Sequence, residues 1–476
     1  MRELKTGIPD LDLILGGGLE LGSVVILAGA PGTGKTILAQ QIAFTNATPE
    51  RKAMYYSTLA EPHTKLVRHL EPFKFYDPTA LGIRVDFIHL GDLVREKSDN
   101  GLPAAIEELN RATREEDPAV IVVDSAKALR DFIAEDQLRT VFYQLAAQAS
   151  HKDAVLLLLG EYTANEMEGS AEFSLADTII ELAFEARQPL DQRWLRVRKR
   201  RGASSLGGKH SFQIHSDGIE VFPRLETLTV VRDGVDGSKI NSGVSGMDAI
   251  MGGGMSSGDS TVVLGPSGAG KTIVGLSFLQ RGLEEGERGL YVSFQETKTE
   301  LLLKAGHFGW GFESAIESDQ LVIHHVPVGT LDLDVLAAAV RRELDRKPIQ
   351  RVVVDSLAEL VFAARESERF PAFARALVGL IQSHRASVMI TSETTTLGPM
   401  TDPTGGLSFL FSNVILLRYI ETDARVLRAV NIIKMRNSDH DKGTFAVEID
   451  ERGMHVEDRL AHVTGILGWS ALRSQG

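Results

Sequence analysis

Short runs rich in apolar residues recur along the chain, and most of them are followed by a small or acidic residue. In the first half these runs span residues 24–27, 53–58, 119–123 and 154–160. Apolar runs without alternation predict strands of a parallel sheet that is buried on both faces. Helical segments lie between them, beginning with residues 37–42. This order predicts an α/β fold with a mostly parallel sheet flanked by helices.

The same series of elements appears twice. Runs at residues 261–264, 289–294, 351–354 and 386–391 repeat the first set in the same order. Gly29 and Gly265 are 236 residues apart, as are Gly7 and Gly243, so the copies agree without a gap over this stretch. A period of this length indicates a duplicated domain. We expect two tandem domains, at residues 1–225 and 226–456, and a tail at residues 457–476.

A glycine-rich motif follows the first long strand of each copy. Its spacing is that of a phosphate-binding loop, in which backbone N–H groups surround a phosphate, a lysine reaches the outer phosphates and a hydroxyl holds magnesium. The predicted ATP-binding residues are Gly29, Pro31, Gly32, Thr33, Gly34, Lys35 and Thr36, and in the second copy Gly265, Ser267, Gly268, Ala269, Gly270, Lys271 and Thr272. Lys35 and Lys271 are also expected to be catalytic, and Thr36 and Thr272 to bind magnesium.

Carboxylates follow the later strands in both copies. Asp124 and Asp355 end buried strands, where we expect them to act in the magnesium shell. Glu61 and Glu296 follow the second long strand and are expected to orient the attacking water. For each acid alone, the alternative is a solvated residue in a strand-to-helix turn. Recurrence behind both phosphate loops favours the functional interpretation.

A basic pair ends the last repeated element. Lys199 and Arg201 share one face of a predicted strand, and Lys434 and Arg436 do the same in the second copy. Two adjacent cations suit the terminal phosphate of a nucleotide. The alternatives are a solvated basic strand or, in the first copy, a nucleic-acid patch.

Composition narrows the class of protein. The chain has no cysteine, which excludes disulfides, thiolate metal sites and cysteine nucleophiles. No apolar run approaches the length that spans a bilayer, and the first residues lack the form of a signal peptide. We therefore expect a cytoplasmic protein. The net charge is −13, and neither half is a basic module built for nucleic acid.

With these motifs the chain resembles the KaiC family of tandem RecA-like ATPases. The resemblance rests on the entry motifs at Gly7 and Gly243, the two phosphate loops, the two Val-Asp-Ser strands and the two Lys-x-Arg pairs. It implies ATP and Mg²⁺ as cofactors and a homo-hexamer with ATP at the subunit interfaces. In such a ring both Lys-x-Arg pairs would reach the nucleotide of the neighbouring protomer.

Two departures from the family pattern stand out. Family members usually carry two adjacent glutamates after the second strand, and Ala60 and Gln295 replace the first of them here. Their loss predicts slow hydrolysis. Autokinase activity in the family uses a Ser-Thr pair, and at these positions the chain has Ser408 and Phe409. Ser408 is therefore a candidate single phosphosite, and an ordinary loop hydroxyl is the alternative.

Three functions fit these features. The leading one is an ATP-hydrolysing ring, with autokinase activity in its second domain, that signals through its nucleotide or phosphorylation state. The second is a RecA-like DNA recombinase or helicase. It is disfavoured because residues 161–174 and 393–408, which would face the strand, contain no lysine or arginine. The third is a scaffold that ATP assembles and in which hydrolysis is vestigial.

Overall fold

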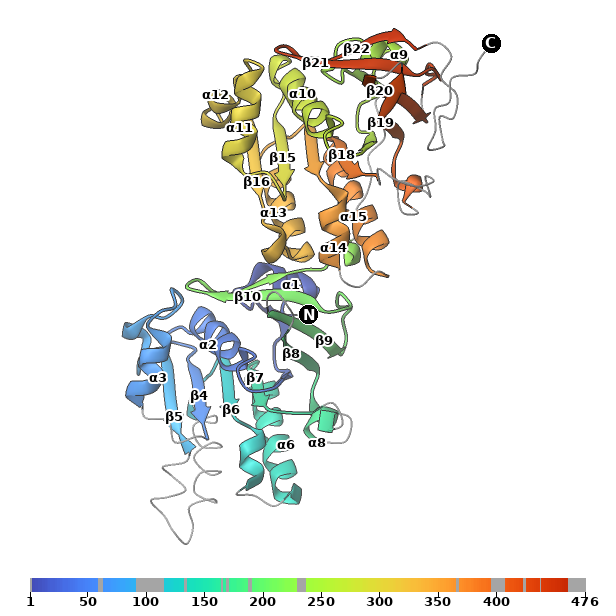
Figure 1. Cartoon of the computed structure of the whole chain (residues 1–476). Coiled ribbons are helices and arrows are strands. Elements are labelled where there is room, and N and C mark those ends of the chain that lie inside the picture. Colours follow the sequence, from blue (N-terminus) through green and yellow to red (C-terminus); the bar gives the residue numbers. More distant parts are fainter. Residues whose placement is uncertain are drawn as a thin grey trace. The chain divides into compact units, whose positions relative to one another are not determined.

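The computed structural model describes residues 2–58, 63–90, 115–131, 135–163, 166–167, 171–186, 191–228, 237–364, 368–394, 407–422, 425–436 and 438–460. The chain divides into two compact units, Met1–Leu228 and Thr229–Gly476. Figure 1 shows a sheet flanked by helices in each of them. The tail beyond residue 460 lies outside the described residues.

The first unit contains a nine-stranded sheet with the order β11-β10-β9-β8-β3-β7-β6-β4-β5. The strands are β3 (Val24–Ala28), β4 (Ala53–Ser57), β5 (Val85–His89), β6 (Val120–Asp124), β7 (Val155–Gly160), β8 (Thr178–Glu185), β9 (Gln192–Arg200), β10 (His210–His215) and β11 (Gly218–Phe222). The six strands from β8 to β5 are parallel, and β9 to β11 continue the sheet in antiparallel fashion.

The second unit repeats this topology strand for strand, with the order β16-β15-β17-β18-β14-β19-β20-β21-β22. Its strands are β14 (Ser260–Gly265), β15 (Gly289–Ser293), β16 (Leu321–His325), β17 (Arg351–Asp355), β18 (Ser387–Glu393), β19 (Asn413–Thr422), β20 (Arg425–Met435), β21 (Phe445–Asp450) and β22 (Gly453–Arg459). A small two-stranded sheet precedes each large one: β1 (Glu3–Leu4) with β2 (Leu19–Glu20), and β12 (Lys239–Ile240) with β13 (Met255–Ser256). The predicted tandem RecA-like fold is confirmed.

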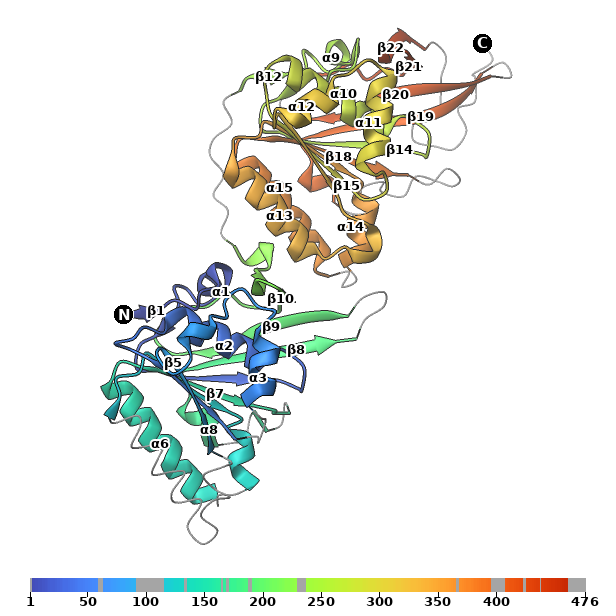
Figure 2. The same ribbon diagram turned by 90° about the vertical axis from the view of Figure 1, so that its left-hand side faces the viewer.

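Helices cover both faces of each sheet (Figure 2). In the first unit they are α1 (Pro9–Ile14), α2 (Lys35–Asn46), α3 (His63–Leu70), α6 (Glu135–His151) and α8 (Ala171–Leu175). In the second they are α9 (Met247–Ile250), α10 (Lys271–Glu284), α11 (Lys298–His307), α12 (Phe312–Glu317), α13 (Leu333–Arg346), α14 (Leu357–Ala364) and α15 (Phe370–Ser383). Among the described residues, no helix is long and apolar enough to span a bilayer.

The apolar runs are buried on both sides because alternate residues face different helices. Val25 and Leu27 of β3 pack with the α2 side of the core, whereas Val24 and Ile26 pack with the α6 side. All residues of β3, β4 and β14 are buried. Each sheet is thus a rigid platform that holds the loops at the carboxyl ends of its parallel strands.

Candidate nucleotide-binding sites

Glycines shape the turns of each phosphate loop. Gly32 and Gly34 have φ values of 74° and 98°, and Gly268 and Gly270 have values of 75° and 102°, which side chains disfavour. Helices α2 and α10 begin directly after these loops, and no side chain caps either helix. A helix end of this kind presents N–H groups and a positive dipole end to an anion.

The motif lysines fold over their own loops. Lys35 donates to the carbonyls of Gly29 and Ala30, both at 2.8 Å, and Lys271 donates to the carbonyl of Pro266 at 2.9 Å. Burial lowers the pKa of both lysines, and nearby carboxylates oppose this shift. Each ammonium group therefore lies where phosphate oxygens would replace the carbonyls as partners.

The motif threonines contact the predicted magnesium aspartates. Thr36 Oγ1 donates to Asp124 Oδ2 at 2.9 Å, and Thr272 Oγ1 donates to Asp355 Oδ2 at 2.8 Å. Mg²⁺ in nucleotide sites takes one or two protein oxygens and completes its shell with phosphates and water. One hydroxyl and one carboxylate beside a phosphate loop fit this requirement in both units.

Tyrosines from the neighbouring strands hold these aspartates, and sequence reasoning missed them. Tyr55 donates to Asp124 Oδ2 at 2.6 Å, and Tyr291 donates to Asp355 Oδ2 at 2.7 Å. Thr391 adds a third hydroxyl on Asp355 in the second unit. Burial, followed by the charge of Asp355, raises the pKa of Tyr291 well above its usual value, so its hydroxyl remains a donor. The sequence signal was a tyrosine at the same position of both strands.

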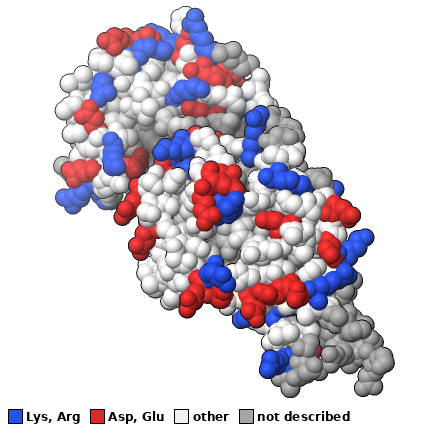
Figure 3. All heavy atoms as spheres, turned by 90° about the horizontal axis from the view of Figure 1, so that it is seen from above, with Lys and Arg blue, Asp and Glu red and all other residues white. Residues whose placement is uncertain are grey.

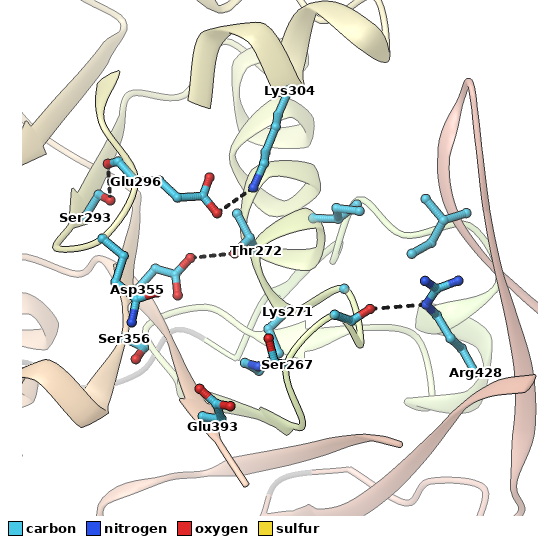
Figure 4. Close-up of a pocket in the computed structure, with 15 residues that line it drawn as sticks. Ser267, Lys271, Thr272, Ser293, Glu296, Lys304, Asp355, Ser356, Glu393 and Arg428 are labelled. Carbon is cyan, nitrogen blue, oxygen red and sulfur yellow. Dashed lines mark hydrogen bonds and ion pairs between the residues drawn. The ribbon is translucent and has the colours of Figure 1, made fainter. Parts of the chain in front are cut away.

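A cavity lies at each loop, about 580 Å³ in the first unit and about 530 Å³ in the second. Each is lined by loop glycines together with the motif lysine, threonine and aspartate, as Figure 4 shows for the second unit. Volumes of this size are typical of small-molecule sites. Glu161 and Glu393 also line the cavities, at the carboxyl ends of β7 and β18.

Comparison with known proteins shows which family this chain belongs to. The sequence model of the KaiC ATPase family matches residues 4–226 and again residues 240–461. The chain belongs to the KaiC family. The resemblance expected from the motifs is thereby confirmed.

Curated relatives align over nearly the whole chain. The circadian clock oscillator protein KaiC of Picosynechococcus sp. is 26% identical over 487 aligned residues, which cover 99% of this chain and 93% of the relative. The circadian clock protein KaiC3 of Synechocystis sp. is 27% identical, with 98% and 94% covered. The circadian clock oscillator protein KaiC of Rippkaea orientalis is 25% identical, with 99% and 92% covered.

An arginine in each unit of this KaiC-family chain also lines the cavity and was not predicted. Arg428 Nε donates to the carbonyl of Gly268 at 3.3 Å. Arg193 lies with its guanidinium carbon 5.0 Å from the ring centre of Phe184, and its buried Nε has no hydrogen-bond partner among the described residues. The signal in the sequence was an arginine six residues before each Lys-x-Arg pair.

The Lys-x-Arg pairs lie beyond a β-bulge in both units. Register shifts in the β8–β9 and β19–β20 pairings stand beside Lys199 and Lys434, and a bulge turns the side chains that follow it. Lys199 and Arg201, like Lys434 and Arg436, are absent from the lining of the cavity in their own unit. The structure therefore does not bring these cations to the phosphate loop that precedes them in the chain.

These cations bond to the short segment that precedes β8 or β19. In the first unit this segment is helix α8, and in the second it is the turn Ser408–Leu410 with the residue that follows it. Lys199 donates to the carbonyl of Phe173 at 3.2 Å, and Lys434 donates to the carbonyls of Ser408 and Phe411, both at 2.9 Å. Burial and the adjacent arginine lower the pKa of both lysines. Ser408, the predicted phosphosite, is exposed on the short helical turn Ser408–Leu410, and its modification remains a prediction.

Glu296 lies three residues beyond β15 and lines the second cavity. Its Oε1 is 2.5 Å from Lys304 Nζ, and its buried Oε2 has no partner among the described residues (Figure 4). A buried oxygen without a partner is costly unless a ligand or water completes it. Glu61 and Ala60 lie outside the described residues, so the role of Glu61 remains a prediction.

The sheet register shows which residues of the two copies correspond. Ser57 of β4 pairs with Asp124 of β6, and Ser293 of β15 pairs with Asp355 of β17. The two serines therefore occupy equivalent places relative to the two magnesium aspartates. The residues that follow Ser57 and Ser293 can therefore be compared position by position.

This count bears on the two glutamates that are expected to orient water. Two and three residues after the serine lie Gln295 and Glu296 in the second unit, but Leu59 and Ala60 in the first. By this count Glu61 lies one position beyond Ala60, the residue that matches Glu296. Residues 59–62 lie outside the described part of the chain, so the role of Glu61 stays a prediction.

Proposed function

We propose that this KaiC-family chain binds and hydrolyses ATP in both units, as a ring that signals through its nucleotide or phosphorylation state. The observation that carries the proposal is the contact of a loop threonine with a strand-end aspartate beside the loop lysine. It occurs in both units and lines a cavity in each.

In this proposal the loop amides and Lys35 or Lys271 hold the outer phosphates. Magnesium, when bound, neutralises phosphate charge, and Thr36 with Asp124, or Thr272 with Asp355, would hold it. The protein then contributes positioning and electrostatic stabilisation of the transferring phosphoryl group. Arg193 and Arg428 add a cation at the rim of each cavity.

Water activation differs between the units. In the second, Glu296 lies in the cavity and is assigned to the attacking water. In the first unit, Ala60 stands at the position that corresponds to Glu296 when counted from the equivalent serines. Glu61, the next residue, is the acid closest to that position in the sequence. The first unit is therefore also compatible with the scaffold function, in which ATP binds and turns over slowly.

A homo-hexamer with ATP at the subunit interfaces is part of the proposal. Both Lys-x-Arg pairs are absent from the lining of the nucleotide cavity in their own unit, which supports a role at the site of a neighbour. Backbone carbonyls hold the pairs in place until such a phosphate is present. Removing an arginine that acts across an interface costs about 10³–10⁵ in rate in other phosphoryl-transfer proteins.

Direct nucleic-acid binding is disfavoured. Figure 3 shows acidic and basic side chains intermixed on the visible face. A strand-binding protein needs a continuous basic groove. Within the described parts of the two candidate loops, Glu161, Glu166, Glu172 and Glu393 are acidic, and residues 164–165, 168–170 and 395–406 lie outside the description.

One experiment tests ATP hydrolysis and autokinase activity together. The full chain is incubated with γ-labelled ATP and magnesium, and both free phosphate and label on the protein are measured. We expect phosphate release by the unchanged chain and loss of protein label in a Ser408→Ala variant. Label unaffected by Ser408→Ala would mean that another residue is modified. Absence of both phosphate release and ATP binding would exclude the proposed enzyme.

A further inference from the structure

A buried carboxylate lies directly behind the second site. Glu359, on the first turn of α14, is 7% exposed. Gln295 Nε2 donates to its Oε1, and Ser356 Oγ donates to its Oε2 at 2.5 Å. Both carboxylate oxygens are thus bonded to neutral donors, which is what an unpaired charge needs in the protein interior.

Both donor residues line the cavity beside the second phosphate loop. Gln295 and Ser356 line it, and Ser356 directly follows the magnesium aspartate Asp355. Glu359 is not part of the lining, but its charge is close enough to oppose the lowering of the pKa of Lys271. The carboxylate therefore lies behind the cavity wall and contacts two of the residues that line it.

The contact fixes the direction of the Gln295 amide. An amide has one carbonyl oxygen that accepts and one NH₂ group that donates. Because the NH₂ group is bonded to Glu359, the carbonyl oxygen remains to accept a hydrogen bond from another group at the cavity. A negative charge on the NH₂ side also polarises the amide and strengthens its oxygen as an acceptor.

We propose that Gln295 positions the attacking water in the second unit and that Glu359 is the positioning residue that holds Gln295. This inference rests on the proposed ATP hydrolysis. The water oxygen forms a bond to the γ-phosphorus, and the bond from that phosphorus to the bridging oxygen breaks, so that ADP leaves with the electron pair. Gln295 accepts a hydrogen bond from the water but takes no proton. The proton passes to Glu296 and then to the solvent with the products.

The sequence of the first unit has no counterpart of this pair. Counted from the equivalent serines, Leu59 stands where the second unit has Gln295. Ala128 lies three residues after Ser125, as Glu359 lies three residues after Ser356. Ser125 is instead bonded through its N–H to Thr58 Oγ1 at 2.9 Å. The proposal thus assigns the faster hydrolysis to the second unit.

The test measures steady-state phosphate release by the full chain carrying Gln295→Ala, Glu359→Gln or both, each in a Lys35→Ala background that disables the first site. We expect Gln295→Ala to lower kcat at least about tenfold, because a water-orienting group acts on the chemical step. Glu359→Gln keeps the size of the side chain and should lower kcat severalfold. KM and the affinity for a fluorescent ATP analogue should stay within about twofold in both variants, since neither residue holds the nucleotide.

The double variant shows whether Glu359 affects kcat by positioning Gln295 or independently of it. Because Glu359 acts through Gln295, adding Glu359→Gln to Gln295→Ala should lower kcat no further. In a Lys271→Ala background, which disables the second site, Glu359→Gln should leave the remaining phosphate release unchanged. Unchanged kcat in either single variant, or additive losses in the double variant, would overturn the proposal.

Failure of the proposed ATP hydrolysis can be distinguished from failure of the Gln295–Glu359 inference. If the unchanged chain binds no ATP and releases no phosphate, the proposed function itself fails. If Glu359→Gln unfolds the protein, Gln295→Ala decides alone, because Gln295 is exposed at the cavity and its truncation leaves the core intact. In that case unchanged kcat in Gln295→Ala refutes the role of the pair.

Discussion

Thr272 Oγ1 lies 2.8 Å from Asp355 Oδ2, and this contact joins the phosphate loop to the central strand β17. The two oxygens that the proposal assigns to magnesium are thus adjacent. We expect Asp355→Asn to lower magnesium-dependent phosphate release from the second unit about 100-fold, as loss of a metal-holding carboxylate does in such sites. ATP affinity measured in the presence of EDTA should change little. An Asp439→Asn variant, at an exposed position, is the matched control.

The loop lysines should be required for nucleotide binding but not for folding. Burial lowers the pKa of Lys35 and Lys271, so their charge is unfavourable in the protein without nucleotide. Lys35→Met and Lys271→Met should therefore keep or raise the melting temperature without ATP. The rise in melting temperature on adding ATP should fall by about half in each variant and vanish in the double variant. Thermal unfolding with and without ATP checks this, and an unchanged ATP response would contradict it.

ATP affinity should weaken at alkaline pH before a normal lysine titrates. The pKa of Lys271 is lowered in the free protein, and bound phosphates would raise it, so binding takes up a proton between the two values. Affinity is then full below the lowered pKa and declines as the pH rises through it. Calorimetry of ATP binding in buffers of different ionisation enthalpy measures this proton uptake. Affinity independent of pH up to 10.5 would show that the lysine is not at the phosphates.

Gln295→Glu should make stability depend on pH. The new carboxylate would face Glu359, and because two adjacent carboxylates cannot both ionise, the pKa of one of them must rise. A raised native pKa means that stability increases as the pH falls through it, so the variant should melt at a higher temperature at pH 5.5 than at pH 8. The unchanged chain serves as the control in the same buffers. Parallel curves for both proteins would mean that the two side chains do not touch.

The Lys-x-Arg pairs should act across subunits. A Lys434→Ala/Arg436→Ala variant and a Lys271→Ala variant should each lose phosphate release from the second unit. Mixing the two allows interfaces in which one subunit supplies the loop and its neighbour supplies the cations. We expect partial recovery of phosphate release in the mixture, which depends on subunit exchange. No recovery after verified exchange would place both functions in one subunit.

The fold was predictable because its strongest signals are local. Unbroken apolar runs specified β3, β6, β14 and β17, and the duplicated loop motif specified two units with the same topology. The contacts of Lys35, Thr36 and Asp124 followed from the motif, since a phosphate loop and a strand-end carboxylate meet at the carboxyl edge of the sheet.

Contacts between side chains of neighbouring elements were not predictable from the sequence, because they depend on how those elements align in the fold. Tyr291 and Glu359 reach the site from neighbouring elements, and the sequence gives no spacing rule that joins them to Asp355 or Gln295. A shift of one residue beyond a strand also changes which side chains correspond, and Glu61 and Glu296 differ by one position when counted from the two strands. The pairing of Ser57 and Ser293 with the aspartates supplies the reference point for that count, and it is visible only in the structure.

The central claim is that both phosphate loops bind ATP and that the chain hydrolyses it. The most direct measurement compares ATP bound per chain and phosphate released by the unchanged protein and by a Lys35→Ala/Lys271→Ala double variant. We predict two ATP molecules per unchanged chain with magnesium-dependent phosphate release, and neither property in the double variant. Equal binding and equal phosphate release by the two proteins would contradict the assignment.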